Sequence, residues 1–528
     1  MNAMLPPSPL VLSSPPLVSY LLRHAAEQPD RLALIDGDTG QGCTYAQLRQ
    51  TVSALAAGLA DAGVAAGSRV AILAKNSKPY VELLLALAAL GAIAVPLNIR
   101  LHPKEMARNI ADAQAHAIVS DATLLPAAEP ISAQVPSVRL KLVMGTEAAG
   151  WLPLGVLAER GASTPFPLDA GDGATVCTLL YTSGTTGQAK GCALAQRTWT
   201  EYATNMAATM GLGRSDTYLA LLPYFHIAGL GTLLSQLVLG GTAVTMAIPD
   251  PARMHELIAA HAVTVAFVVP GISGPFIELA PAGASSLRLV IIGAGLERRD
   301  VPAAIRDRLG ADCVAIYGQS ESGTKLTWAT AADLERNPGT YGRFMPTMTY
   351  RLVDEEDRDV PEGQPGELIV RGGSVMLGYW NRPEASAEAL RNGWMHTGDV
   401  FVRESGGTLR MVDRVKYLIK TGGENVYPQE VENVLREHPD VADVAVGGVP
   451  HPHWGEAVKA YIVPAAGAMP DRAGLAEWVR QSIARYKVPR YIEFVDKIPR
   501  NESGKIVKYL LAERPVDESQ AVPGSGHA

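Results

Sequence analysis

The sequence has few cysteines, few charged residues and no long uninterrupted hydrophobic run. Its four cysteines are scattered without a C-x-x-C pair, which disfavours a disulfide framework or a thiolate metal cluster and favours a reducing, cytoplasmic compartment. Only 19% of residues are charged and the formal net charge is −7, so broad electrostatic capture of nucleic acid is not expected.

Membrane-spanning and export signals are also missing from the pattern. The uncharged stretch 83–97 contains Gly91 and Pro96 and falls short of the ~18 residues of a spanning helix. No basic residue precedes Arg23, which is the wrong pattern for a signal peptide. We expect no transmembrane segment and no export, and peripheral membrane contact stays open.

What is present is enough apolar side chain for several cores. The chain has 528 residues, 47% of them hydrophobic, and this length predicts about three to four domain-sized units. Strand-like and helix-like segments alternate from Val70 to Val119 and again from Tyr218 to Tyr317, which predicts two mainly parallel sheets with flanking helices. Residues 349–411 carry short strands with Gly and Asp turns, which predicts an antiparallel sheet or a small β-barrel-like subdomain.

A compact α+β pattern begins after Asp413, with helix-like segments at 429–437 and 474–485 and strand-like segments at 441–449, 458–463 and 491–495. The predicted fold is therefore α/β. It has a large N-terminal domain (1–414), a small mobile C-terminal domain (415–515) and a flexible tail (516–528).

The strongest local motif is YTSGTTGQAKG at 181–191, which lies between two strand-like runs. Its glycines let backbone N–H groups turn toward an anion, and its hydroxyls and lysine suit a polyphosphate. It lacks the spacing of a Walker A loop, and a solvated turn is the alternative from these residues alone. The candidate nucleotide-binding residues are Thr182, Ser183, Gly184, Thr185, Thr186, Gly187 and Lys190.

The loop resembles the phosphate loop of the adenylate-forming (ANL) superfamily of acyl-CoA synthetases, nonribosomal-peptide adenylation domains and luciferases. Other segments similar to that superfamily follow in its order, and the resemblance covers residues 21–511. They are LPYFH at 222–226, GAG at 293–295, YGQSE at 317–321, GELIVRG at 366–372, WMHTGD at 394–399, VDRVK at 412–416, TGGENVYP at 421–428 and PRNESGK at 499–505.

The resemblance implies an ATP·Mg2+ site. Glu321, together with Thr186, is implied as a Mg2+ ligand, and this hard cation suits a carboxylate beside phosphate oxygens. Asp399 and Arg414 are implied as ribose contacts, a role that acidic residues play in other nucleotide sites. The other implied nucleotide contacts are Gly293, Ala294, Gly295, Tyr317, Gly318, Gln319 and Ser320. Without the resemblance, Tyr317 is better interpreted as core packing and Asp399 as a turn residue.

Lys505 lies in a basic segment of an acidic protein, because residues 485–508 contain seven Lys or Arg and three acidic residues. A long ammonium side chain can neutralise charge that develops as pyrophosphate leaves. The resemblance makes Lys505 the adenylation lysine and Lys416 the hinge about which the small domain turns. After that turn, the loop of Gly422, Gly423, Glu424 and Asn425 is implied to face the active site and help line the tunnel for the pantetheine arm of coenzyme A.

His226 stands where superfamily members that activate amino acids usually carry an ammonium-binding Asp, so an amino-acid substrate is disfavoured. The flanking residues 224–231 are apolar or small, which suits a fatty or aromatic tail. His226 is predicted to gate the acid or position its carboxylate, with a buried core histidine as the alternative.

We therefore predict an ATP-dependent acid–CoA ligase whose substrates are a carboxylic acid, ATP and coenzyme A, with Lys505, Glu321 and His226 as catalytic residues. The first alternative is an acyl-adenylate ligase that loads a carrier protein. The second is a catalytically silent nucleotide- or acyl-binding protein. A homodimer and the identity of the acid stay open.

Overall fold

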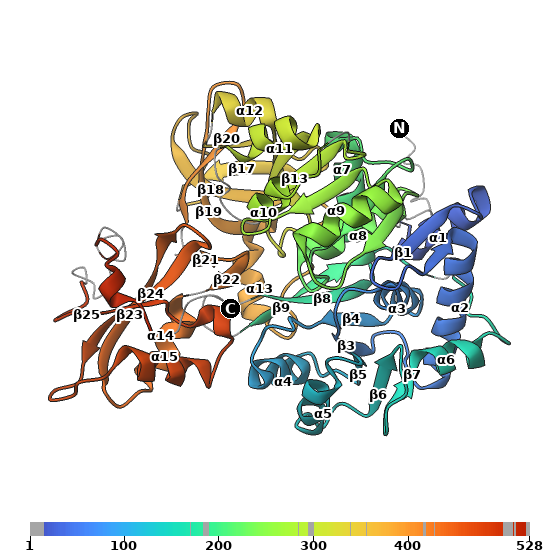
Figure 1. Ribbon diagram of the computed structural model, residues 1–528, viewed down its shortest axis with the longest axis horizontal. Coiled ribbons are helices and arrows are strands. Elements are labelled where there is room, and N and C mark those ends of the chain that lie inside the picture. Colours follow the sequence, from blue (N-terminus) through green and yellow to red (C-terminus); the bar gives the residue numbers. More distant parts are fainter. Residues whose placement is uncertain are drawn as a thin grey trace, which may run out of the picture.

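The computed structural model describes residues 15–168, 171–182, 189–282, 285–293, 300–337, 339–354, 356–414, 419–426, 428–499, 511 and 514–523. They form a large α/β body and a smaller α+β body beside it, which carries β21–β25 (Figure 1). The two predicted parallel sheets are both present, and they belong to the large body.

The first sheet has the strand order β7-β6-β5-β3-β4-β8-β9. Alternation along β3 assigns its two faces, because successive side chains of a strand point to opposite sides. Val70 and Ile72 join the core that also holds α3, whereas Ala71 and Leu73 join the core under α4. The strands are β3 (Arg69–Leu73), β4 (Ile93–Pro96), β5 (Ala117–Asp121), β6 (Leu140–Met144), β7 (Leu152–Pro153), β8 (Val176–Thr182) and β9 (Lys190–Ala195).

The second sheet is longer and changes from parallel to antiparallel along its width. Its order is β17-β18-β19-β20-β16-β15-β14-β13-β12-β10-β11-β1-β2. The parallel part comprises β1 (Leu32–Asp36), β10 (Thr217–Ala220), β11 (Thr242–Thr245), β12 (Val265–Val268), β13 (Leu289–Gly293) and β14 (Asp312–Gly318), with β2 (Gly42–Thr44) antiparallel at the edge.

The antiparallel strands predicted as a sheet or small barrel continue this second sheet. They are β15 (Lys325–Thr330), β16 (Thr340–Phe344), β17 (Thr349–Val353), β18 (Pro365–Arg371), β19 (Met395–Arg403) and β20 (Leu409–Arg414). Their apolar side chains enclose a core of their own around Phe401, next to the two parallel sheets.

The helices of the large body cover both sheets. Residues of α1, α3, α7 and α8 join one continuous core with strands of both sheets. The helices are α1 (Leu17–Glu27), α2 (Tyr45–Asp61), α3 (Lys78–Ala89), α4 (Pro103–Asp112), α5 (Leu125–Ala133), α6 (Leu154–Gly161), α7 (Gln196–Met210), α8 (Ile227–Val238), α9 (Pro251–His261), α10 (Ser273–Glu278), α11 (Val301–Leu309), α12 (Ala331–Arg336) and α13 (Pro383–Ala389), with a 3-10 turn at Arg391–Gly393.

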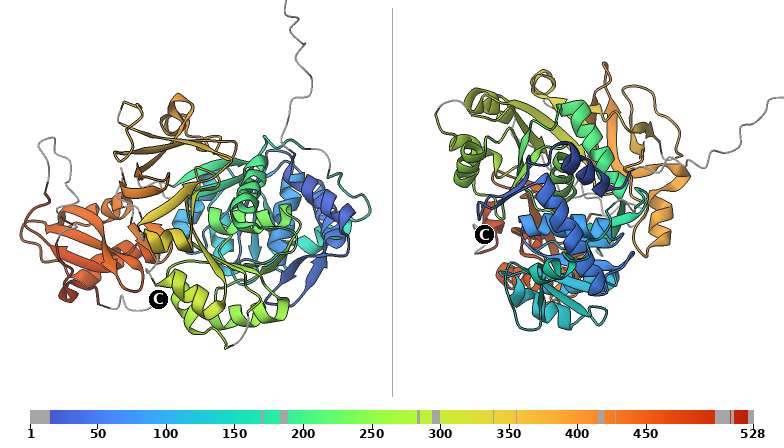
Figure 2. Two further views of the ribbon diagram at one scale, coloured as in Figure 1. Left: turned by 90° about the horizontal axis from the view of Figure 1, so that it is seen from above. Right: turned by 90° about the vertical axis from the view of Figure 1, so that its right-hand side faces the viewer.

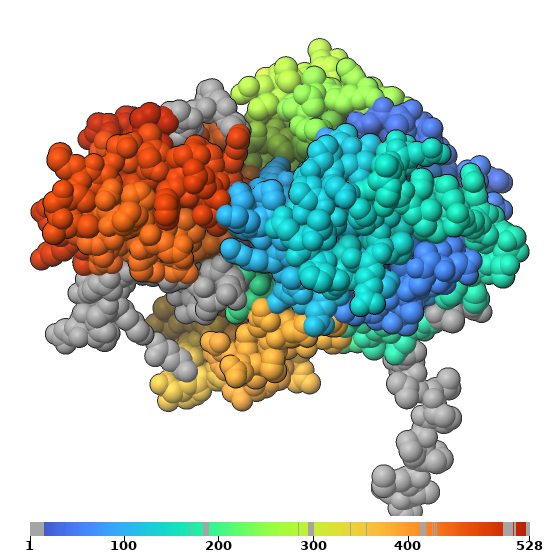
Figure 3. Space-filling view, turned by 90° about the horizontal axis from the view of Figure 1, so that it is seen from below, coloured from blue at the N-terminus to red at the C-terminus, as the bar shows by residue number. Residues whose placement is uncertain are grey.

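The small body has its own sheet and core. Strands β21 (Ile419–Thr421), β22 (Glu424–Val426), β23 (Val441–His451), β24 (Gly455–Pro464) and β25 (Tyr491–Phe494) pack with α14 (Pro428–Arg436) and α15 (Arg472–Arg480). Short 3-10 turns lie at Arg485–Lys487 and Glu518–Gln520. Figures 2 and 3 show this body against one side of the large body, and Figure 3 shows light-blue N-terminal segments next to it.

Part of the predicted flexible tail is packed against the small body. Ala521 forms a β-bridge with Tyr491, and the Val522 N–H donates to the Arg490 carbonyl at 2.8 Å. The Val522 side chain is buried in the core of the small body. The expectation of a loose tail is therefore wrong for this segment, because an apolar residue near its end has a core to enter.

Candidate active site

The described site residues lie where strands of both large-body sheets end. Tyr317 and Gly318 end β14, Gly293 ends β13 and Thr182 ends β8. His226 follows β10 and directly precedes α8. In open α/β sheets, ligands bind outside the carboxyl ends of the strands, so this edge is the candidate active site.

A hydrogen-bonded cluster surrounds Asp399 at one end of the site. The Asp399 carboxylate is buried and accepts from the Tyr317 hydroxyl at 2.5 Å and from Gln319 Nε2 at 2.7 Å. Gln319 Nε2 also donates to the Thr397 carbonyl at 2.9 Å. The Tyr317 ring packs on Phe401, with centroids 5.3 Å apart. The structure thus brings together three predicted nucleotide contacts from β14, its following turn and β19.

A second cluster surrounds Glu321, in the turn after β14. Its carboxylate accepts from the Tyr379 hydroxyl at 3.0 Å and from Thr182 Oγ1 at 3.4 Å. Lys190 lies over the Tyr379 ring, with Nζ 5.0 Å from the centroid. Burial raises the pKa of Glu321, and Tyr379, Thr182 and Lys190 partly offset that effect. The predicted residues Thr182 and Lys190 therefore lie beside the predicted Glu321, whose carboxylate is held by two hydroxyl donors near one cation.

Strand packing also requires glycine at two of the predicted nucleotide contacts, Gly318 and Gly293. A Cβ at Gly318 would lie 2.7 Å from the Thr324 carbonyl oxygen, and a Cβ at Gly293 would lie 2.8 Å from the Ile316 carbonyl oxygen. Side-chain atoms essentially never approach backbone this closely, so no larger residue fits at either position. Ser320 is half-buried in the same turn, and its carbonyl accepts from the Gly323 N–H at 3.0 Å.

The small body reaches the site through the turn between β21 and β22. Gly422 and Gly423 have φ of +57° and +78°, a region that glycine enters without strain. The turn presents Glu424, whose side chain is 4% exposed, to Arg100 Nη1 at 2.5 Å. His226 Nε2 lies 3.4 Å from the same carboxylate, and Asn98 Nδ2 donates to it at 3.4 Å.

Charges across this contact keep Glu424 ionised. Burial alone would raise the pKa of Glu424, but His226 and Arg100 lower it to about 2. Arg100 itself is 48% exposed, so the pair lies at the rim of the contact between the two bodies.

A second ionic contact joins the two bodies at Lys487. Its ammonium is buried and lies 2.9 Å from Glu105 in α4 and 2.6 Å from Glu430 in α14. Burial alone would lower the pKa of Lys487, but Glu430 and Glu105 hold it above its ordinary value. Burial, together with the proximity of Glu105, raises the pKa of Glu430 although Lys487 opposes the shift.

Several predicted residues lie outside the described part of the chain. These are Lys505, Ser183, Gly184, Thr185, Thr186, Gly187, Ala294, Gly295 and the hinge residue Lys416; the Arg414 backbone is described and pairs with Asp399 in the β19–β20 ladder. Their predicted roles stay predictions.

Three further residues at the site were not singled out from the sequence: Tyr379, Arg100 and Asn98. All three lie in segments without a recognisable motif. Glu424 belongs to the loop that the resemblance implied, but its contacts with Arg100 and His226 were not predicted.

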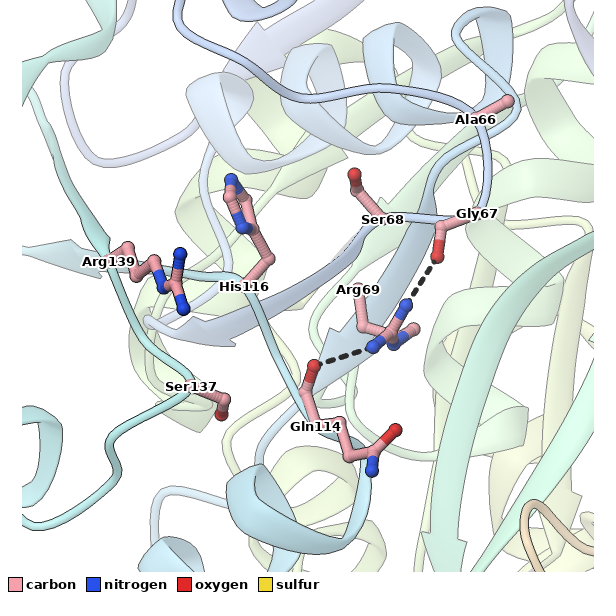
Figure 4. A pocket seen from close by; sticks show the side chains of 8 residues that line it. All are labelled: Ala66, Gly67, Ser68, Arg69, Gln114, His116, Ser137 and Arg139. Carbon is pink, nitrogen blue, oxygen red and sulfur yellow. Dashed lines mark hydrogen bonds between the residues drawn. The ribbon is translucent and has the colours of Figure 1, made fainter.

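A different hollow lies at the opposite edge of the first sheet, where β3, β5 and β6 begin. Arg69, His116 and Arg139 line it (Figure 4). The Arg69 guanidinium donates to the carbonyls of Ala113 at 2.9 Å, Gly67 at 2.9 Å and Gln114 at 2.8 Å, so three of its five N–H donors are used within the protein. This hollow contains no predicted site residue.

The described residues contain neither a helix that could span a membrane nor a cluster of candidate metal ligands. No helix there is long and apolar enough to cross a membrane. No group of three or more His, Cys, Asp or Glu side chains there could hold a metal ion.

Comparison with known proteins identifies the class of enzyme. The family model for AMP-binding enzymes matches residues 21–380, and the model for the C-terminal domain of AMP-binding enzymes matches residues 430–505. The chain therefore belongs to the AMP-binding enzymes, which are the adenylate-forming superfamily that its motifs resemble.

Relatives narrow this class to the acid–CoA ligases. The chain is 37% identical over 502 residues to a feruloyl-CoA synthase of an Amycolatopsis species, covering 94% of this chain and 99% of that protein. It is 34% identical over 509 residues to the indoleacetate–CoA ligase of Aromatoleum aromaticum, covering 94% and 98%. The protein is thus an enzyme of the acid–CoA ligase family.

One solved protein has different TM-scores to this chain in two of its complexes. The o-succinylbenzoate CoA synthetase of Bacillus subtilis is 27% identical, and each comparison covers 94% of this chain and 98% of that chain. A double mutant of it bound to a product analogue, OSB-NCoA, has a TM-score of 0.81. The complex with the acyl-adenylate intermediate OSB-AMP has a TM-score of 0.68.

Proposed function

We propose that this enzyme joins a mainly apolar carboxylic acid, fatty or aromatic, to coenzyme A in two steps. The acid's carboxylate attacks the α-phosphorus of ATP, which gives acyl-AMP and releases pyrophosphate. The thiol of coenzyme A then attacks the acyl carbon, which gives the thioester and releases AMP. Because an anion must approach an anionic phosphate in the first step, positioning and charge neutralisation carry most of the catalysis.

The Glu321 cluster fits a Mg2+ ion that is shared with ATP. Mg2+ is commonly held by one or two carboxylates and completed by phosphate oxygens and waters, and Glu321 is one carboxylate facing the end of β8, where the phosphate loop begins. Glu321 and Thr186 would hold the ion, which would offset negative charge on the phosphates. Lys190 adds a positive charge nearby, and we assign to Lys505 the neutralisation of the departing pyrophosphate.

We assign ribose binding to Asp399, supported by Tyr317 and Gln319. Their hydrogen bonds to one carboxylate oxygen fix the Asp399 side chain before the nucleotide arrives. A carboxylate held in this way can accept bonds from two vicinal hydroxyls without losing further rotational freedom.

The contact of Glu424 with Arg100 and His226 carries the proposal for the second step. It holds the Gly422–Gly423 turn at the site, with the Cβ position of Gly423 only 3.9 Å from Val269 Cγ2. The higher TM-score to the product-analogue complex than to the acyl-adenylate complex supports the same orientation. We therefore propose that this orientation serves thioester formation and that residues 415–515 turn about Lys416 to bring Lys505 to the site for adenylation.

His226 is assigned the placement of the acid's carboxylate. It directly precedes α8, packs on Phe225 with ring centroids 4.6 Å apart and is 38% exposed on its side chain. This exposure disfavours the alternative of a buried core histidine. The glycines that follow it have a packing role, because a Cβ at Gly231 would lie 2.3 Å from the Tyr202 ring.

The test is pyrophosphate release with ATP and Mg2+ over a panel of acetate, malonate, hexanoate, palmitate, benzoate and hydroxycinnamates, each with and without coenzyme A. We expect pyrophosphate release and a CoA thioester with at least one fatty or aromatic acid, and loss of both in Lys505→Ala. Adenylate without thioester would instead support loading of a carrier protein. No pyrophosphate release with any acid of the panel would contradict the proposal.

A further inference from the structure

A buried lysine that none of the assigned roles uses lies behind the site. Lys325 begins β15 and is 4% exposed. Its ammonium donates to Met206 Sδ at 2.8 Å and to Thr232 Oγ1 at 3.3 Å. It also lies over the rings of Tyr202 and Phe267, 4.6 and 5.3 Å from their centroids.

The surroundings of Lys325 contain hydroxyl, thioether and aromatic groups but no counter-ion. Among the described residues no carboxylate forms an ion pair with this ammonium, whereas the buried Lys459 and Lys487 each have one. Burial lowers the pKa of Lys325 well below its ordinary value, with no opposing charge. A buried cation without a counter-ion is costly, so the position of Lys325 asks for a role beyond packing.

Lys325 is linked to the His226 region of the site through α8. Its partner Thr232 is six residues after His226 on the chain, and five of these steps lie in α8. At 1.5 Å per residue those five steps span ~7.5 Å along the helix. Phe267, under the ammonium, comes two residues before Val269, which contacts the Gly423 position.

Strand β15 also places the backbone of Lys325 next to the nucleotide side of the site. Lys325 pairs with Gly318 in the β14–β15 ladder, and the Lys325 Cα lies 2.8 Å from where a Gly318 Cβ would be. The backbone of Lys325 is therefore held against the strand that carries Tyr317, while its ammonium reaches α7 and α8.

We infer that Lys325 selects acids whose far end carries an oxygen that accepts a hydrogen bond from its ammonium, either a carboxylate or a phenol. This inference rests on the proposed function and refines its substrate class: the acid has an apolar body and a polar tip. The rings of Tyr202 and Phe267 flank the position of the tip. The tip oxygen accepts a hydrogen bond from the Lys325 ammonium. No carboxylate among the described residues fills that position.

The experiment compares acids of matched shape with and without the tip oxygen. The panel is cinnamate, 4-methylcinnamate, 4-hydroxycinnamate and 4-carboxycinnamate, with octanoate and suberate as an aliphatic pair. For each acid, kcat/KM is measured by pyrophosphate release in the wild type, in Lys325→Met, which keeps the length of the side chain, and in Lys325→Arg, which keeps its charge.

In the wild type we expect a preference of about ten- to a hundredfold for a tip-oxygenated acid over its matched partner, the range of one hydrogen bond to a charged group. Lys325→Met should reduce that preference by at least about tenfold, with kcat/KM for cinnamate or octanoate within about threefold of wild type. Lys325→Arg should keep part of the preference. A gain with 4-carboxycinnamate or suberate alone identifies an anionic tip, and a gain with 4-hydroxycinnamate alone identifies a phenol.

Two results would overturn the inference. An unchanged preference in Lys325→Met, with equal loss on all acids, would show that Lys325 only packs. A wild type that favours the matched acids without tip oxygen would refute the inference without any variant, even if Lys325→Met fails to fold. Failure of the proposed function is a different result, because the wild type would then release pyrophosphate with no acid in either panel.

Discussion

Replacing Glu424 by Gln removes the charge at the contact between the two bodies while it preserves the size of the side chain. The ordinary pKa of 4.5 and the value of about 2 in this contact differ by about 2.5 units. At ~1.36 kcal/mol per unit, the contact favours the ionised over the neutral side chain by about 3 kcal/mol. Because Arg100 is 48% exposed, solvent screens part of this energy, and we expect an effect of about 1.5–3 kcal/mol in the variant.

If this orientation serves thioester formation, Glu424→Gln should slow thioester formation and spare adenylation. Isotope exchange between ATP and pyrophosphate, measured with the acid, should stay within about threefold of wild type. Conversion of preformed acyl-AMP to thioester in a single turnover should fall by about ten- to a hundredfold, the same energy expressed as a rate. Glu437→Gln is the matched control, because Glu437 is an exposed residue of the same body.

The sign of the pH effect follows from the lowered pKa of Glu424. Its ionised form stabilises the contact above pH 4.5, and this stabilisation is lost as pH falls from 4.5 toward 2. Equal losses in both half-reactions, or an intact thioester step, would refute the reasoning.

Two further predictions concern other ion pairs. The pKa of Glu430 is raised from 4.5 to about 7, so the contact around Lys487 loses stability as pH rises from 4.5 to about 7. Glu105→Gln should therefore weaken the decrease in the rate of thioester formation over that pH range, and an unchanged pH profile would contradict this. Asp216 is buried and accepts from Arg288 Nε and Nη2, both at 2.7 Å, and from Thr264 Oγ1 at 2.8 Å. Arg288 is 41% exposed, so solvent screens the charge left behind, and Asp216→Ala should lower the free energy of unfolding by about 2 kcal/mol in a urea titration. Glu256→Ala, in an exposed pair, should lower it by less than ~1 kcal/mol.

Local patterns predicted the elements that bring the site together. The alternation from Val70 to Val119 and from Tyr218 to Tyr317 was enough to expect two parallel sheets, and both are present. The strand-like runs on either side of the phosphate motif pair as an antiparallel hairpin, with Thr182 opposite Lys190. These features depend on side chains a few residues apart, so they can be read in the order of the chain.

Pairing between distant segments could not be predicted in the same way. β1 lies between β2 and β11, about 210 residues away from the latter along the chain, and nothing in its five residues specifies that neighbour. The tail near Val522 was expected to be loose, yet it packs on β25 because a core position is open to it. Such outcomes depend on which apolar surfaces remain to be covered once the other elements have formed.

The sequence alone identified the superfamily, because its motifs resemble those of the superfamily in the same order, and that resemblance supplied most of the candidate nucleotide contacts, which stay predictions. Only the tertiary structure decided which partners those groups have. Glu424 meets Arg100 across 324 residues, and Glu321 meets Tyr379 across 58. Lys325 likewise looks like an ordinary strand residue until α7, α8 and β12 enclose it. Burial and charge pairing, which set the pKa and hence the role of each group, arise only when distant segments exclude water together.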